Sequence, residues 1–304
     1  MELSIVIVSF NTKDLLVDCV ESIFANTRNL KFEVVVIDNA SSDASVEAIQ
    51  KLKIENFKLK IIRNRMNLGF AEANNQGLKK AKGEFVLFLN SDTVIKDNLL
   101  KEMVSWMKNN PGVGISTCAL KNRDGSLQGT GGYFPTLIRV FSWMTIQDIP
   151  FVDFLIKPFH PLKAKSFFKS ESFYKKKREL DWVTGAFFLT RKEIFGGVEQ
   201  WDKNYFMYFE EVDLCFRAKR LGWRVMYLPQ WSILHYGGAS GTSEFSTLSE
   251  FRGIKRFYKK FYPHWQYPLL RLFLKIGSLA RIVALVILEG RESAKIYVKA
   301  YKQA

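Results

Sequence analysis

Apolar runs and amphipathic segments alternate along the first third of the chain. The apolar runs have the length and the β-branched or aromatic content of buried strands, and the segments between them repeat apolar side chains at helical spacing. Strands separated by single helices predict an α/β fold with a mostly parallel sheet and right-handed crossovers. The predicted strands are 4–9, 33–37, 58–62 and 85–92, and the predicted helices are 12–24, with Thr12 as its cap, a short one opened by Ser42 or Asp43, and 71–81.

The rest of the chain begins irregularly and ends regularly. Residues 129–177 are aromatic, basic and interrupted by prolines, which predicts an excursion of loops and helices. A buried strand is expected at 180–190, a helical segment at 206–221 and a last strand at 225–228. From residue 248 onward the pattern is helical and cationic.

Polar side chains gather where the predicted strands end. Because the carboxyl ends of parallel strands meet at one edge of a sheet, these side chains predict a crevice for a polar ligand. Neither the glycine fingerprint of dinucleotide enzymes nor that of P-loop ATPases occurs, which argues against both classes. The polar positions are Ser9, Asn11, Asp38, Asn39, Asn90 and Asp92.

A second group of candidate catalytic residues is acidic. Glu210, Glu211 and Asp213 follow the aromatic run 205–209 and open a predicted helix. Acids in a first turn can serve the helix dipole alone, for about 0.3–1 kcal/mol each. Aromatic surroundings would instead desolvate a carboxylate and raise its pKa towards the range of a general base, and we favour this interpretation.

His235 is the third candidate, because it precedes a glycine-rich loop at 237–241 that could approach phosphates or close over a ligand. A lone histidine is more often structural than a ligand. Together with Asp92 and two diphosphate oxygens, however, His235 would make a plausible Mg²⁺ or Mn²⁺ site.

These segments, in this order, resemble family 2 glycosyltransferases of the GT-A fold, and in particular the rhamnosyltransferase-like enzymes that build bacterial cell-surface polysaccharide. Each segment alone is weakly specific, whereas their ordered succession is highly specific. The resemblance covers roughly residues 3 to 245. The matching segments are 4–11, 38–43, 67–71, 74–77, 89–93, 182–186, 209–214 and 235–238.

The resemblance implies metal-binding and catalytic roles. Asp92 takes the last position of the family's acidic metal-binding motif, and His235 resembles its distal histidine ligand. Glu211 stands where such enzymes place the base that deprotonates the acceptor hydroxyl, with Glu210 and Asp213 as the other candidates. Glu211 replaces the commoner Asp, so its carboxylate reaches one methylene further.

The resemblance also implies binding roles. Asp38 would recognise the base and ribose of a nucleotide-sugar. Asn90 stands where many relatives have a first Asp, which leaves one carboxylate fewer for the metal. The implied donor-binding residues are Ser9, Asn11, Asp38, Asn39, Asn67, Gly69, Asn74, Asn90 and Ser91, and the implied acceptor-binding residues are Trp182, Thr184 and Gly185.

The implied reaction is inverting transfer of a sugar from a nucleoside-diphosphate donor, dTDP-rhamnose or a UDP-sugar, to a saccharide acceptor that is lipid-linked. Two alternatives remain open. A sugar-nucleotide nucleotidyltransferase would need glycines directly after the first strand, and residues 9–13 lack them. A non-catalytic nucleic-acid-binding protein is suggested by charge alone, but the basic segments lie outside the predicted sheet, so we expect no nucleic-acid partner.

Charge is concentrated in two places. The chain carries a net charge of +15, of which residues 251–304 contribute twelve Lys or Arg against two Glu, and residues 157–178 contribute eight against one Glu. Within the apolar segment 268–290, the cations Arg271, Lys275 and Arg281 recur at helical spacing. A basic stripe beside a broad apolar face predicts a helix lying on an anionic membrane, with docking onto the body or a homodimer as the alternatives.

These patterns predict two parts of the chain and their location. Residues 1–247 would form the GT-A domain, with a nucleotide-sugar half at about 1–120 and an acceptor half at about 121–247, and residues 248–304 would form a basic, amphipathic helical extension. No signal-peptide pattern precedes the first strand, and the three cysteines are scattered singly. We therefore expect a cytoplasmic protein, peripheral at the inner face of the cell membrane.

Overall fold

The computed structural model describes residues 1–52, 54, 58–147, 152–161, 171–238 and 242–304. Its contacts divide the chain into two compact units. The first unit comprises Met1–Gly131 and Glu171–Ser240, and the second comprises Gly132–Ser170 and Gly241–Ala304. Of the predicted acceptor half, residues 132–170 and 241–247 therefore group by contacts with the C-terminal helices, whereas residues 171–240 group with the sheet.

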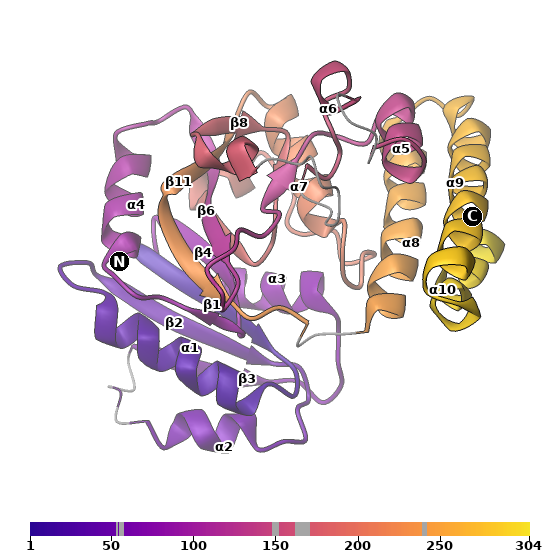
Figure 1. Cartoon of the computed structure of the whole chain (residues 1–304). Coiled ribbons are helices and arrows are strands. Elements are labelled where there is room, and N and C mark those ends of the chain that lie inside the picture. The colour runs from indigo at the N-terminus through magenta and orange to yellow at the C-terminus, as the bar shows by residue number, and fades with distance from the viewer. Residues whose placement is uncertain (53, 55–57, 148–151, 162–170, 239–241) are drawn as a thin grey trace. The chain divides into compact units, whose positions relative to one another are not determined.

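A nine-stranded sheet forms the centre of the first unit (Figure 1), in the order β3-β2-β1-β4-β10-β6-β11-β5, with β8 paired to β11. The pairs among β1 to β4 and the pair β6–β11 are parallel, which confirms the predicted mostly parallel α/β sheet. The strands are β1 (Leu3–Ser9), β2 (Phe32–Asp38), β3 (Leu59–Arg63), β4 (Phe85–Asn90), β5 (Thr93–Val94), β6 (Val113–Lys121), β7 (Gly131–Gly132), β8 (Arg178–Leu180), β9 (Trp182–Val183), β10 (Phe187–Arg191) and β11 (Arg224–His235).

The strand register brings the predicted polar ends together. Ser9 is paired with Asp38, Asp38 with Arg63, and Val8 with Asn90, so the four neighbouring strands β3, β2, β1 and β4 end at one edge. Apolar side chains of β1, β2 and β4 are fully buried beneath this edge. The helices of this unit are α1 (Lys13–Asn26), α2 (Ser45–Gln50), α3 (Phe70–Lys80), α4 (Leu99–Lys108) and α7 (Glu210–Arg220), with 3₁₀ turns η1 (Glu171–Lys175) and η2 (Lys192–Gly196).

Several predicted elements were wrong in detail. The expected single strand at 180–190 is two strands, because the chain turns between β9 and β10 and then runs antiparallel to β4. The helix expected from residue 206 begins at Glu210, since Tyr208 and Phe209 adopt left-handed φ angles of 69° and 79°. The fourth strand ends at Asn90, which places Asp92 in the turn that follows it.

The second unit is helical. Helix α9 contacts α5, α8 and α10, and its buried residues include Leu270, Leu274 and Ser278. None of the helices in the described ranges is both long and apolar enough to cross a membrane. The helices are α5 (Leu137–Met144), α6 (Val152–Leu155), α8 (Ser243–Phe261), α9 (Gln266–Leu288) and α10 (Arg291–Gln303).

Two of the three cations predicted to form a stripe on α9, Lys275 and Arg281, contact neighbouring helices. Arg281 donates hydrogen bonds to the Trp143 carbonyl at 2.6 Å and to the Tyr297 hydroxyl at 2.7 Å, and Lys275 lies 5.7 Å from the ring centre of Tyr301. Aromatic partners on α5 and α10 thus draw these cations against the helices, where their charge meets the π faces. Sequence spacing alone could not show this, because the partners come from other helices.

One face of α9 exposes apolar side chains. The exposed residues recur at alternating spacings of three and four, which places them along one stripe of the helix. We call them the α9 stripe. Its members are Leu269, Leu272, Ile276, Leu279, Val283 and Val286, with exposed fractions between 37% and 60%.

Candidate active site

Asn39, at the end of β2, organises the donor side of the site. Its side-chain amide donates to the Asn67 side chain at 3.1 Å and to the Gly69 carbonyl at 3.2 Å, and its oxygen accepts from Asn64 at 2.8 Å. The Asn67 oxygen in turn accepts from the Gly69 amide at 2.9 Å. These bonds fix the loop that enters α3 beside the strand end, so three of the predicted donor-binding positions form one connected group.

Asp38 lies beside this group with an unused acceptor. The side chain is 4% exposed, and its Oδ2 accepts from the Ser41 amide at 3.3 Å. Its other oxygen, Oδ1, is buried and has no hydrogen-bond partner among the described residues. Buried carboxylate oxygens are normally bonded, so this atom fits a ligand that brings a donor, such as a base N–H or a ribose hydroxyl.

A chain of hydroxyl groups connects β1 to the turn after β4. Ser9 and Thr12 lie 3.0 Å apart through their hydroxyl oxygens, and the Thr12 hydroxyl donates to Ser91 at 2.9 Å. Thr12 occupies the N-cap position of α1, but its side chain caps no amide, contrary to the sequence prediction. Its hydroxyl instead links two of the predicted donor-binding residues.

Two other predicted donor-binding residues, Asn11 and Asn74, are held within the fold. Asn11 has a left-handed φ of 53°, and its side-chain oxygen accepts from the Ser42 amide at 2.8 Å, which braces the loop after β2. Asn74 is buried on α3 at 1% exposure, and no hydrogen bond joins it to the other donor positions among the described residues. The donor-binding role of both residues stays a prediction.

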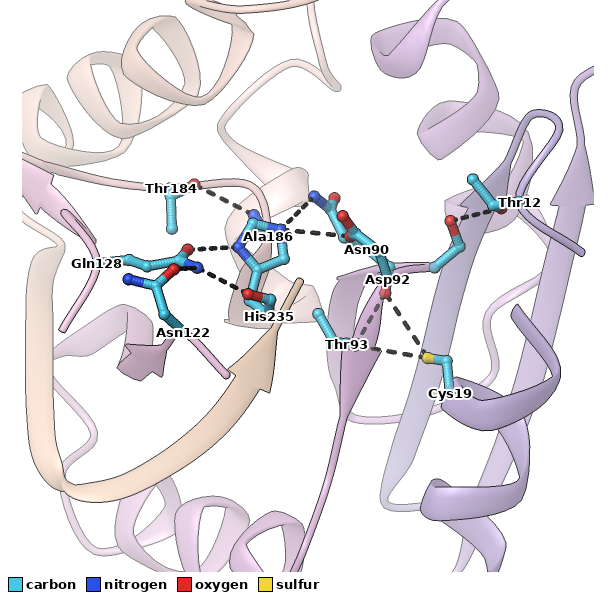
Figure 2. Close-up of polar contacts among 11 residues, drawn as sticks. Thr12, Cys19, Asn90, Asp92, Thr93, Asn122, Gln128, Thr184, Ala186 and His235 are labelled. Carbon is cyan, nitrogen blue, oxygen red and sulfur yellow. Dashed lines mark hydrogen bonds and ion pairs between the residues drawn. The ribbon is translucent and has the colours of Figure 1, made fainter. Parts of the chain in front are cut away.

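Asp92 and His235 are far apart in the sequence and lie side by side (Figure 2). His235 ends β11 and is paired with Thr93 of β5, and the Tyr236 amide donates to the Asp92 carbonyl at 2.9 Å. The Asp92 Oδ1 atom lies 3.3 Å from His235 Nε2, and the Asn90 side-chain nitrogen lies 3.4 Å from the same ring atom. Both carboxylate and imidazole are buried or nearly so.

Gln128 determines which ring nitrogen of His235 faces Asp92. The Gln128 amide nitrogen donates to the Asn122 side chain at 2.6 Å and to the His235 carbonyl at 2.7 Å, so its oxygen is the atom 2.6 Å from His235 Nδ1. An oxygen there accepts, hence Nδ1 carries the proton. In the neutral ring, Nε2 then directs a lone pair towards Asp92 (Figure 2).

This arrangement fits a divalent cation that is shared with a ligand. A lone pair and a carboxylate oxygen 3.3 Å apart repel each other unless a proton or a cation lies near both. No group of three His, Cys, Asp or Glu that could hold a metal occurs in the described part of the chain. Mg²⁺ and Mn²⁺ are commonly held by one or two side chains together with substrate phosphates, which is what Asp92 and His235 offer. The loop predicted to close over the ligand includes residues 239–241, which lie outside the described residues.

The acidic cluster occupies the first turn of α7. Glu210 is 4% exposed, and burial, followed by the charge of Glu211, raises the pKa of its carboxyl group well above the usual value. Asp213 is fully buried and accepts from Arg217 at 2.6 Å. Arg217 also donates to the carbonyl groups of the segment before α7, so the Asp213 carboxylate is committed to holding that segment. Asp213 thus has a structural task, and a catalytic role for any of the three acids stays a prediction.

The N-terminus of α3 joins the donor group to the acidic segment and to the predicted acceptor turn. The Phe70 amide donates to the Phe206 carbonyl at 2.7 Å, close to the start of α7. Gly69, with φ of 82°, passes so near that a Cβ there would lie 2.5 Å from the same oxygen. A Cβ at Gly185 would lie 3.1 Å from the Phe70 ring. The predicted donor, base and acceptor segments thus converge on one helix end.

The acceptor turn also reaches the strand end that carries the metal-binding candidates. The Asn90 amide donates to the Ala186 carbonyl at 3.0 Å, and the Ala186 amide donates to the Thr184 hydroxyl at 3.3 Å (Figure 2). Trp182 is 6% exposed on β9, which contacts α7. The turn therefore lies between the two candidate chemical groups of the site.

Sequence reasoning missed the residues that support the site. Gln128 and Asn122 orient His235, yet they lie more than a hundred residues before it in an unremarkable polar stretch. Asn64 and Thr12 likewise support the site through hydrogen bonds, to Asn39 and to Ser91 respectively. The one available signal was Thr12, which stands directly after the first strand end and was interpreted only as a helix cap.

Comparison with known proteins agrees with this geometry. The family model described as "Glycosyl transferase family 2" matches residues 4–196. The rhamnosyltransferase WbbL of Escherichia coli K12 is 26% identical over 249 residues, which cover 80% of this chain and 86% of that protein. The N-acetylglucosaminyl-diphospho-decaprenol L-rhamnosyltransferase of Mycobacterium tuberculosis is 25% identical over 216 residues, which cover 67% of this chain and 66% of that protein.

The fold comparison points the same way. The crystal structure of GalNAc-T7 with UDP, GalNAc and Mn²⁺ superposes with a TM-score of 0.64 at 17% sequence identity, covering 99% of this chain and 55% of that one. The likeness supports the predicted GT-A fold, with a sheet flanked by helices. Since the family model spans well over half of the sequence and ends beyond the turn at Gly185, this chain belongs to glycosyl transferase family 2.

Proposed function

We propose that the chain transfers a sugar from a nucleoside-diphosphate donor to a hydroxyl group of a lipid-linked saccharide during cell-surface polysaccharide synthesis. The observation that carries the proposal is the convergence of Asp92 and His235 beside the polar strand ends of a family 2 fold. The two relatives named above are rhamnosyltransferases, and one of them acts on a decaprenol-linked diphosphosaccharide. They favour dTDP-rhamnose as the donor, with a UDP-sugar as the alternative.

The donor would bind across the carboxyl edge of the sheet. Asp38 offers a buried oxygen to the base or ribose, and the Asn39–Asn67–Gly69 group fixes the loop beside it. Because these side chains are already held by one another, little ordering would be needed when the donor binds. The nucleotidyltransferase and nucleic-acid-binding alternatives are set aside by the family match.

A Mg²⁺ or Mn²⁺ ion would be held by Asp92 and His235, and when bound it would neutralise charge on the leaving diphosphate. The residues of this chain have separate tasks around it. Gln128 keeps the proton on His235 Nδ1, so that Nε2 is available as a ligand atom. Asn90 supplies an amide where relatives have a carboxylate, which adds no negative charge opposite the diphosphate.

The acceptor hydroxyl would be activated by a carboxylate of α7. We assign this role to Glu211, with Glu210 as the neighbour whose raised pKa keeps it protonated over a wider pH range. The acceptor oxygen forms a bond to the anomeric carbon while the bond from that carbon to the diphosphate breaks, and the hydroxyl proton passes to Glu211. A single displacement of this kind inverts the anomeric configuration.

The C-terminal helices would bring the enzyme to its lipid-linked acceptor. The α9 stripe exposes apolar side chains, and α10 exposes Arg291, Lys295, Lys299 and Lys302. Apolar area and cations on neighbouring helices suit peripheral attachment to an anionic membrane on the cytosolic side. A homodimer through the same stripe is the competing outcome.

A donor screen tests the function. Thermal unfolding is followed with dTDP-rhamnose, UDP-glucose, UDP-N-acetylglucosamine and GDP-mannose, each with Mg²⁺, Mn²⁺ or EDTA. A specific donor should raise the melting temperature in the presence of a metal ion, since a ligand that binds only the folded state stabilises it. Release of the nucleoside diphosphate on addition of a lipid-linked saccharide then establishes transfer. A protein that binds none of these donors, or binds without releasing nucleotide to any acceptor, would contradict the proposal.

A further inference from the structure

A cationic pocket lies in the second unit, where α8 meets the start of α9. Its volume is about 410 Å³, which is within the range of sites that hold small ligands. No Asp or Glu is among the residues that line it in the described part of the chain. The lining residues are Arg252, Lys255, Arg256, Lys259 and Lys260 of α8 and Tyr267 of α9.

The five cations are placed on one face of α8 by their spacing. They recur at intervals of three and four along residues 252–260, which contain no acid. Three pairs of them stand four residues apart, a spacing at which like charges destabilise a helix. Negative charge placed near this face would therefore stabilise the helix.

Contacts in the unit hold the pocket in shape. The Lys255 ammonium donates to the Gln303 carbonyl at the end of α10, and Arg252 donates to the Ser249 hydroxyl at 3.0 Å. The Lys259 ammonium lies 4.9 Å from the ring centre of Tyr267. Burial, and then the charges of Arg271 and Lys259, lower the pKa of Lys255. An ordinary solvated lysine face would show neither this partial burial nor these fixed contacts.

The chemistry of the lining indicates the ligand. Arginine and lysine donors that converge on one cavity suit phosphate oxygens, for which guanidinium groups make paired hydrogen bonds. Several cations lining one cavity favour a ligand with more than one negative charge. We propose that this pocket binds a diphosphate group. The identity of the natural ligand rests on the proposed function, according to which the diphosphate belongs to the lipid-linked acceptor. A free diphosphate has the same chemistry.

Calorimetric titration with inorganic pyrophosphate tests the pocket. EDTA is present, so that the metal-dependent donor site of the first unit is not loaded, and ionic strength is low to limit screening. The wild-type protein should bind pyrophosphate, and the double variant Lys259→Glu with Lys260→Glu should bind it roughly tenfold or more weakly, because two charge-assisted contacts are reversed. The matched control is Lys79→Glu with Lys80→Glu, which changes the net charge equally at two adjacent exposed positions of α3 and should bind like the wild type. Equal loss in both variants, or no binding by the wild type, overturns the proposal.

A vesicle experiment separates the two sources. Vesicles of phosphatidylcholine that contain farnesyl diphosphate are compared with vesicles that contain phosphatidylglycerol at the same surface charge. Preferential binding to the diphosphate vesicles, reversed by added pyrophosphate, identifies a lipid diphosphate, whereas pyrophosphate binding without that preference identifies a free one. If the charge-reversal variant unfolds at a lower temperature, Lys259→Gln with Lys260→Gln replaces it. Release of the nucleoside diphosphate on addition of a lipid-linked saccharide is followed in parallel with the wild type. Its absence would contradict the proposed function, while the pyrophosphate titration would still test whether the pocket binds a diphosphate.

Discussion

In the first unit, the polar side chains at the strand ends hold one another; in the second, the helices direct apolar and cationic side chains outward. Asn39, Thr12 and Gln128 each connect segments that are far apart in sequence, and they leave single atoms such as Asp38 Oδ1 available. In the second unit, by contrast, the α9 stripe and the cationic pocket each expose several side chains of one kind. On the proposed function, the first unit would offer fixed atoms to a small donor, and the second would offer broad patches to a larger, less regular partner.

The first prediction concerns the proposed catalytic base in the first unit. Glu211→Gln removes the proposed base without changing the size of the side chain, so turnover should fall about 10²–10⁴-fold while donor affinity is kept. Nucleotide release and donor binding are measured side by side. Glu193→Gln, an exposed carboxylate of the same unit, is the control and should behave like the wild type. Near-full turnover by Glu211→Gln would move the role to Glu210.

The second prediction concerns the exposed apolar α9 stripe of the second unit. Leu272→Asp with Val283→Asp puts two charges on the α9 stripe, and each lost apolar contact should weaken partition onto anionic vesicles roughly tenfold, about a hundredfold together. Co-sedimentation measures the partition. Met66→Asp with Leu221→Asp alters two comparably exposed apolar residues of the first unit and should leave it unchanged. If wild type and stripe variant sediment alike but the variant alone is monomeric, the stripe is a dimer interface.

The third prediction tests whether Gln128 supports metal binding by orienting His235. Gln128→Leu removes the acceptor for His235 Nδ1, and the loss of such a supporting bond typically costs about 10–100-fold in metal affinity. Titration of Mn²⁺, followed by electron paramagnetic resonance, measures this without turnover. Gln50→Leu, at an exposed position, serves as the control. Unchanged Mn²⁺ affinity in Gln128→Leu would mean that His235 is not a ligand.

The smallest predicted effect is on stability. Burial and the charge of Glu211 raise the pKa of Glu210 in the folded state above its unfolded value. Such a group stabilises the fold below its unfolded pKa, and that contribution is lost as pH rises through the folded pKa, by about 1.4 kcal/mol for each unit of displacement. Glu210→Gln should therefore gain in unfolding free energy over the wild type as pH rises, and match it in acid.

Urea unfolding at a series of pH values measures this difference. Glu193→Gln, whose carboxylate is exposed, should follow the wild type throughout. Parallel pH profiles for the wild type and Glu210→Gln would show that Glu210 is not held in its protonated form by its surroundings.

The sequence predicted the parts of the site that follow from strand periodicity and motif order. The alignment of Ser9, Asp38 and Asn90 is dictated by parallel register, so polar residues at apolar run ends were sufficient. Gln128 could not be predicted, because its contact with His235 crosses 107 positions and depends on the path of β11. The start of α7 was missed because the left-handed residues before it are aromatic, a type that rarely adopts that conformation.

In the C-terminal helices too, sequence spacing could not predict contacts with distant parts of the chain. Helical spacing correctly put the cations of α9 on one stripe, yet it could not tell inward from outward, because Trp143 and Tyr297 on other helices decide that. The broad apolar face predicted beside the cations is present as the exposed α9 stripe.

The stereochemistry of transfer tests the central claim most directly. The claim is that one carboxylate of α7 activates the acceptor for a single displacement at the anomeric carbon of a donor held at the strand ends. Nuclear magnetic resonance of the product made with the donor identified by the screen gives the anomeric configuration of the new bond. Inversion relative to the donor is the predicted result. Retention would require a second displacement and a covalent or ion-paired intermediate, and would contradict the roles assigned to Glu211 and its neighbours.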